Sequence, residues 1–216
     1  MPEIENPGRE RILQRIRSAL AVPTQRPDGG GGESLFAPVA DLIERFQGEC
    51  STNRTECVLI AGPHASATAI AGILASLPPG EIFVQDHSQL RQMATAWAPD
   101  RTLRWSSEGV PRENSQATIT LADWLVAETG SVLVSSSCGG RAATIAAPVH
   151  IVVADQSQLV PDLATVFSRI RENGAAQVNS MLCLITGSSR TADIEKILVM
   201  GAHGPRRLVV VLGEGS

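Results

Sequence analysis

The chain has 216 residues, of which 43% are hydrophobic, 19% charged and 3% aromatic, and its formal net charge is −4. This balance is typical of a globular protein and argues against a disordered chain, a fibre or a coiled coil. Because Asp and Glu outnumber Lys and Arg, a nucleic-acid-binding surface is not expected.

Four cysteines, at positions 50, 57, 138 and 183, are too far apart in the sequence for a metal or iron–sulfur motif. We find neither an apolar leader nor a run approaching the ~18 apolar residues that span a bilayer. We therefore expect a cytoplasmic protein with reduced thiols, no membrane insertion and no cofactor of its own.

Residues 1–33 are expected to form a helical arm followed by a linker. Asn6 and Pro7 are typical of a helix start, and the helix should end before Pro23. Its apolar positions form one stripe, Ile12, Leu13, Ile16 and Leu20. Four consecutive glycines then predict a flexible linker. Such a stripe needs a partner, either the chain's own domain or another chain.

Residues 34–216 alternate between amphipathic segments and short apolar runs. The runs predicted as buried strands are 57–61, 81–85, 102–105, 150–154, 181–185 and 208–212. The predicted helices are centred on residues 39–46, 70–77, 89–97, 159–170 and 190–199. This alternation predicts an α/β domain whose mostly parallel sheet is covered by helices on both faces. In such sheets ligands bind outside the carboxyl ends of the strands.

One candidate ligand-binding segment follows the predicted strand 181–185. Its polar residues and glycine are Gly187, Ser188, Ser189, Arg190, Thr191 and Asp193. Hydroxyls, backbone N–H groups and a guanidinium beside a helix start would bind an anion. The alternative is that Ser189 only caps the helix while Asp193 complements its dipole.

A second candidate is the polar interruption Glu128–Thr129–Gly130–Ser131 between two apolar runs. A carboxylate and two hydroxyls beside a glycine suggest a bulge or turn that directs polar groups to one place. Glu128 would then be a candidate acid or base. The alternative is an exposed turn with a solvated carboxylate.

Two glycine-containing loops complete the set of candidates. Arg141 follows Gly139 and Gly140 and could present its charge to an anion, although such stretches are more often plain loops. His203 and Gly204 lie between the last helix and the last strand, in a segment that is also architectural. The histidines show no metal-ligand spacing, so no metal site is predicted.

Taken together, the segments 122–131, 148–153, 186–195 and 201–205 resemble the LUD-domain family in order and spacing, mainly over the C-terminal half. The chain departs from the family pattern at Ser188, where Pro is usual, and at Ser131, where Thr is usual. The resemblance implies a fold similar to the NagB/RpiA/CoA-transferase-like proteins.

The resemblance also implies a role in oxidising L-lactate to pyruvate, beside sister subunits that carry iron–sulfur clusters. The leading hypothesis is a component that binds lactate, pyruvate or a phosphorylated anion at the strand ends, with Arg190 and Arg141 pairing the anion. One alternative is a non-catalytic scaffold or regulatory subunit that docks on the iron–sulfur partners. Another is an independent CoA-transferase-like or isomerase-like enzyme, suggested by the fold alone.

Overall fold

The structure is a computed structural model that describes residues 7–21, 38–62, 65–97, 101–111, 113–172, 180–191, 199–200 and 204–214. The chain divides into two units, Met1–Ala37 and Pro38–Ser216. The first unit contains helix α1 (Pro7–Leu20), which has no buried residue. As predicted, this helix starts at Pro7 and ends before Pro23, whereas Asn6 lies outside the described residues.

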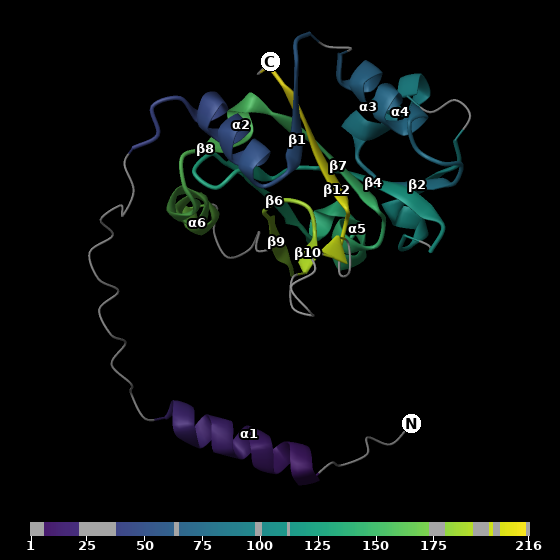
Figure 1. The fold of residues 1–216 in the computed structure, drawn as a ribbon. Coiled ribbons are helices and arrows are strands. Elements are labelled where there is room, and N and C mark those ends of the chain that lie inside the picture. Colours follow the sequence, from purple (N-terminus) through teal and green to yellow (C-terminus); the bar gives the residue numbers. More distant parts are fainter. Residues whose placement is uncertain are drawn as a thin grey trace. The chain divides into compact units, whose positions relative to one another are not determined.

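Six parallel strands form the central sheet of the second unit, in the order β1-β12-β7-β4-β2-β3 (Figure 1). They are β1 (Thr55–Ile60), β2 (Glu81–Val84), β3 (Leu103–Trp105), β4 (Ser115–Leu121), β7 (Val149–Asp155) and β12 (Arg207–Gly213). Five of them match predicted strands. Strand β4 was not predicted because Ser115, Thr118 and Thr120 interrupt its apolar pattern, although all three are buried.

Helices cover one face of the central sheet and a mixed layer covers the other. On the first face lie α3 (Ala65–Ala75) and α4 (Ser88–Trp97), which pack on side chains of β2, β4, β7 and β12. On the second face lie a smaller sheet and two helices, α2 (Leu42–Thr52) and α5 (Arg141–Ile145). The predicted α/β architecture, with a mostly parallel sheet covered on both faces, is therefore confirmed.

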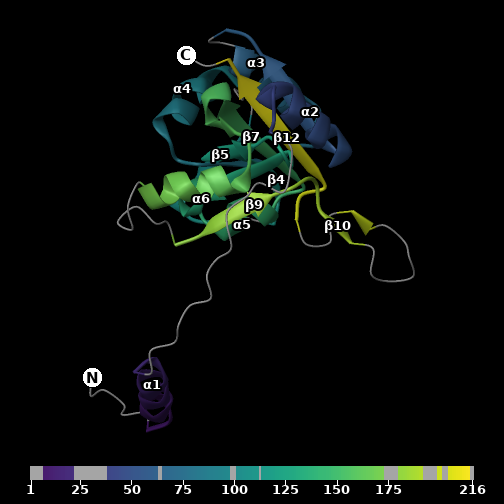
Figure 2. The same cartoon turned by 90° about the vertical axis from the view of Figure 1, so that its left-hand side faces the viewer.

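The smaller sheet has the strand order β8-β5-β6-β9. Two of its strands, β5 and β9, are labelled in Figure 2. Its strands are β5 (Trp124–Val126), β6 (Ser131–Ser135), β8 (Leu159–Val160) and β9 (Leu182–Ile185). Helix α6 (Leu163–Glu172) covers its outer face by packing Val166 against Leu133 and Val160. The described residues also include the short 3-10 helices Ser106–Glu108, Ser136–Cys138 and Gln156–Gln158.

Three predictions for the second half were wrong in detail. The run 181–185 belongs to the smaller sheet as β9 and pairs antiparallel with β6, so it is not a strand of the parallel sheet. Leu159 and Val160 form β8 rather than the start of a helix. The predicted helix 190–199 is wrong at both ends, where β10 (Arg190–Thr191) and β11 (Val199–Met200) pair antiparallel.

All six central strands run the same way, so the sheet has an amino edge, where they begin, and a carboxyl edge, where they end. Strand β5 leaves the carboxyl edge after Leu121 and β6 returns to it, because β5 and β6 are antiparallel neighbours. The loop between them therefore lies towards the amino edge. Among the described residues, no helix is long and apolar enough to cross a membrane.

Candidate functional site

Two of the predicted polar segments meet at the ends of β5 and β9. Thr129 Oγ1 lies 2.7 Å from Ser131 Oγ, which in turn lies 2.6 Å from Thr186 Oγ1. Two residues beyond Thr186, the hydroxyl of Ser188 is buried and has no hydrogen-bond partner among the described residues. We call Thr129, Ser131, Thr186 and Ser188 the hydroxyl cluster.

Helix α2 positions both loops of the hydroxyl cluster. Asn53, which caps its C-terminus, donates from Nδ2 to the Thr129 carbonyl oxygen at 2.9 Å. The backbone of Asn53 also lies against Gly187, where φ is +82° and an added Cβ would collide with the Asn53 carbonyl oxygen. Because Asn53 precedes β1, the hydroxyl cluster lies at the amino edge of the central sheet.

Glu128 is held in place by its backbone. Its N–H donates to the Pro161 carbonyl at 3.0 Å, and its own carbonyl accepts from Arg45 Nη2 at 3.2 Å. Gly130 adopts φ +61° and packs so closely on Glu49 and Cys50 that a Cβ would lie 2.8 Å from their backbone. Gly130 must therefore be glycine for the loop to close on α2.

The remaining predicted residues of this region are only partly described. Ser189 N–H donates to the Pro205 carbonyl at 2.8 Å, and a Cβ on Gly204 would lie 3.3 Å from Ser189 Cβ. Arg190 and Thr191 form β10, with only their backbone described. Asp193 and His203 lie outside the described residues, as does His64.

A second polar cluster, which the sequence analysis missed, lies at the carboxyl edge of the central sheet. Here β2 leads outward to β3, while its neighbour β4 leads in the opposite direction to β7. Ligands of open α/β sheets bind at such a reversal of strand order, outside the carboxyl ends of the strands. Gln85 joins the two strands, because its Oε1 accepts from Leu121 N–H at 2.8 Å.

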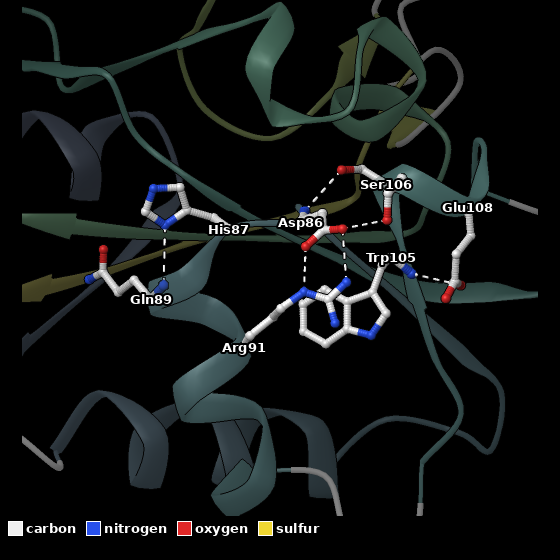
Figure 3. Close-up of polar contacts among 8 residues, drawn as sticks. Asp86, His87, Gln89, Arg91, Trp105, Ser106 and Glu108 are labelled. Atoms are coloured by element: carbon white, nitrogen blue, oxygen red, sulfur yellow. Dashed lines mark hydrogen bonds and ion pairs between the residues drawn. The ribbon is translucent and has the colours of Figure 1, made fainter.

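Asp86, directly after Gln85, is the centre of this cluster (Figure 3). Its carboxylate accepts from Arg91 Nε and Nη2 at 2.5 and 2.8 Å and from the Ser107 hydroxyl. Its backbone N–H donates to Ser106 Oγ at 2.9 Å. The hydrogen bonds from Arg91 and Ser107 lower the pKa of Asp86 to about 2. Arg91 also stacks on Trp105, with its guanidinium carbon 4.2 Å from the ring centroid.

The structure places the Arg141 loop at this carboxyl edge and not beside Gly187. Gly139 has φ +104°, and an added Cβ would lie 2.8 Å from Ser106 Cβ and 3.0 Å from the Phe83 ring. Arg141 follows two residues later, is exposed, and makes no ion pair within the described part of the chain. That Arg141 and the 187–191 segment face one anion stays a prediction, because the side chains of Arg190 and Thr191 lie outside the described part of the chain.

The carboxylate of Asp123 also lies at the carboxyl edge of the central sheet. This residue follows β4, and its Oδ2 accepts from Ser135 N–H at 2.6 Å, next to the 3-10 helix that leads to Gly139. Burial raises the pKa of Asp123, while the hydrogen bonds from Ser135 act in the opposite direction. Contacts thus continue from Asp123 through Ser135 and Gly139 to Ser106 and Asp86. In the sequence, the signal for Asp123 was a single Asp two residues after β4. Because that strand was not predicted, the signal was missed.

The described residues contain no group of three or more His, Cys, Asp or Glu side chains arranged to hold a metal ion. His150, a predicted strand residue, is fully buried in the central sheet, with Nε2 2.9 Å from Thr120 Oγ1. Its environment is that of a core residue.

Comparison with known proteins gives a consistent result. Residues 111–212 match the model of the LUD domain. Lactate utilization protein C of Bacillus pumilus is 27% identical over 189 residues, covering 80% of this chain and 78% of the relative. Lactate utilization protein C of Bacillus subtilis is 33% identical over 129 residues, covering 51% of this chain and 54% of the relative.

A solved structure shows the same fold. A DUF162 family protein from Deinococcus radiodurans superposes with a TM-score of 0.59 at 17% identity, covering 80% of this chain and 96% of that chain. The superposed region therefore extends well beyond the C-terminal half, in which most of the motifs lie. The LUD-domain match over residues 111–212 and the relatives named lactate utilization protein C agree with the resemblance that the spacing of the motifs indicated.

Proposed function

We propose that this protein is a component of a lactate-utilization system and binds a small organic anion, lactate or pyruvate, at the carboxyl edge of its central sheet. The names of its relatives support the first part. Electron transfer then takes place in sister subunits with iron–sulfur clusters, as the resemblance to the LUD-domain family implied, and this chain binds the anion.

The observation that carries the location is the contact of the Arg141 loop with Ser106 where β2 and β4 diverge. Arg141 is a fixed cation that can pair with the ligand carboxylate through two parallel hydrogen bonds. Asp123 is the acid or base candidate for the ligand hydroxyl, because it is a carboxylate at this edge whose pKa is raised by burial. Arg91 is less suited to bind the ligand, because its guanidinium already donates two hydrogen bonds to Asp86.

Calorimetric titration of the purified chain with L-lactate and with pyruvate tests this proposal. Replacing Arg141 by Ala should weaken binding roughly tenfold or more, as expected for the loss of a charge-assisted hydrogen-bond pair. Arg171→Ala, on exposed α6, is the matched control and should bind as wild type. Equal affinity of Arg141→Ala and wild type would refute the location.

Asp123→Asn and Glu128→Gln separate the two acid/base candidates. If the carboxyl edge acts in lactate oxidation, Asp123→Asn should abolish lactate-dependent growth in a strain lacking the native protein. Glu128→Gln should then support growth. Growth of the Asp123→Asn strain together with loss of growth in Glu128→Gln would instead identify Glu128 as the acid or base.

A scaffold function remains a second candidate because of α1. Ile12, Ile16 and Leu20 of its stripe are 60%, 49% and 78% exposed. If this stripe docks on a sister subunit, deleting residues 1–33 should abolish co-purification with the lactate-utilization partners. Retention of the complex would exclude that role for α1.

A further inference from the structure

We propose that the hydroxyl cluster is a separate oxyanion-binding site at the amino edge of the central sheet. The chemistry is that of a phosphoryl or carboxylate group. Strand β6, five residues long, separates the hydroxyl cluster at its start from Ser135, which leads to the Arg141 loop, by roughly 15 Å. The inference therefore does not depend on the lactate site proposed above.

The number of hydroxyl protons shows that one O–H group of the cluster has no acceptor within it. Thr129, Ser131 and Thr186 carry three O–H groups but make only two hydrogen bonds among themselves. One proton is therefore left for an acceptor outside the trio. Thr129 and Thr186, at the two ends of the trio, are exposed, so an external acceptor can reach that proton.

Ser188 supplies a second unused donor. Ser188 is only 5% exposed, yet its hydroxyl has no hydrogen-bond partner in the part of the chain that the structure describes. Leaving a buried hydroxyl unpaired costs about 1–3 kcal/mol, which is rarely tolerated without a ligand or another compensation. An oxyanion that reaches Ser188 would recover this cost.

Backbone geometry holds these donors in fixed positions before any ligand binds. Gly130 and Gly187 both have positive φ and leave no room for a side chain against α2. Asn53 contacts both loops, through its side chain to Thr129 and through its backbone to Gly187. A preorganised set of donors binds an anion without the entropic cost of ordering the loops.

The charges next to the contact points favour an anion. Arg54 adjoins Asn53, and Arg206 adjoins Pro205, the acceptor of the Ser189 N–H. Both arginines are exposed, and neither side chain has a partner within the described residues. Nearby Glu49 and Glu56 are already paired with Arg45 and Arg207. The carboxylate of Glu128 has no partner within the described part of the chain and opposes anion binding, so its removal should strengthen binding.

Titration of the full chain with inorganic phosphate at constant ionic strength tests the site, followed by amide NMR shifts and by thermal unfolding. We expect saturable shifts at residues 129–131 and 186–189 and a rise in the unfolding temperature. Ser188→Ala should weaken phosphate binding roughly tenfold and raise the unfolding temperature of the free protein, because an unpaired buried hydroxyl is removed. Ser76→Ala, at the end of α3, is the matched control.

Three further variants sharpen the test. Arg206→Gln should weaken phosphate binding, Arg171→Gln should not, and Glu128→Gln should strengthen it. Phosphate shifts scattered over the surface, or equal binding by Ser188→Ala and wild type, would overturn the proposal.

A lactate arm separates this site from the one proposed above. Lactate binding that is lost in Arg141→Ala and kept in Ser188→Ala supports two separate sites. Lactate binding that is lost only in Ser188→Ala supports the oxyanion site and refutes the carboxyl-edge location. Absence of any lactate binding refutes the proposed function and leaves the phosphate result to decide the hydroxyl cluster.

Discussion

At the scale of single residues, the central sheet contains a buried histidine whose titration is linked to stability. His150 has no exposed surface, and its Nδ1 has no hydrogen-bond partner among the residues that the structure describes. Burial lowers the pKa of His150 from 6.5 to about 4. The unfolded chain therefore takes up this proton at a higher pH than the folded protein does.

This linkage predicts a loss of stability on acidification. The contribution of neutral His150 is fully present above pH 6.5 and is lost progressively as pH falls towards 4, by roughly 3 kcal/mol in total. Denaturant unfolding of wild type and His150→Gln between pH 4 and 8 should show this extra slope only in wild type. His87→Gln, at an exposed position, should keep the slope. Equal slopes in wild type and His150→Gln would contradict the prediction.

Replacing glycine by alanine should change the stability of the protein in opposite directions at positions 187 and 72. Gly187→Ala should destabilise the protein by roughly 2–4 kcal/mol, because φ is +82° and the new Cβ meets the Asn53 carbonyl. Gly72→Ala, within α3 and with nothing within 4 Å of its Cβ position, should stabilise by about 0.5–1 kcal/mol. Urea unfolding of both variants measures the contrast, and a neutral Gly187→Ala would show that the loop can move away from α2.

At the scale of elements, helix α2 connects the fold to the hydroxyl cluster. It buries Phe46 and Cys50 in the core, and Arg45 and Asn53 hold the Glu128–Thr129 loop from its exposed side. Asp41 caps its N-terminus by accepting from Ile43 and Glu44 N–H at 2.9 and 3.0 Å. The position of the loop therefore depends on how firmly this one helix is folded.

Removing the cap should loosen α2 and its contacts with the loop. Asp41→Ala should cost about 1 kcal/mol, while Asp41→Ser, which can still cap, should cost little. Hydrogen exchange should increase in Asp41→Ala over residues 42–52 and at 129–131, and not in α6. An unchanged exchange rate at 129–131 would show that the loop does not depend on α2.

At the scale of the whole molecule, all four cysteines pack into or against one core cluster, between the central and the smaller sheet. Burial raises the pKa of Cys138 to about 11, and a hydrogen bond with Cys57 together with burial raises that of Cys50. Iron is bound by thiolates, so Cys50 and Cys138 are poor ligands, whereas the hydrogen bond with Cys50 lowers the pKa of Cys57. The cysteines thus behave as small core residues.

This arrangement predicts that the chain purified alone is colourless. Its visible absorption spectrum should show no iron–sulfur band, and elemental analysis should find no stoichiometric iron. Iron at one or more atoms per chain, retained after desalting, would contradict this expectation and the assignment of electron transfer to partners.

The sequence by itself determined the strand-and-helix alternation and most of the central strands, and it singled out Glu128–Ser131 and Gly187–Asp193 as polar segments. Apolar runs report burial, and glycines beside hydroxyls report turns, so both signals are local. Only the tertiary structure decided that 181–185 pairs in a second sheet, because a buried run does not specify its neighbour. Likewise, only the sheet order placed Asp86, Asp123 and Arg141 at one edge and the hydroxyl cluster at the other. Strand order is fixed by packing between distant segments, and no local pattern encodes it.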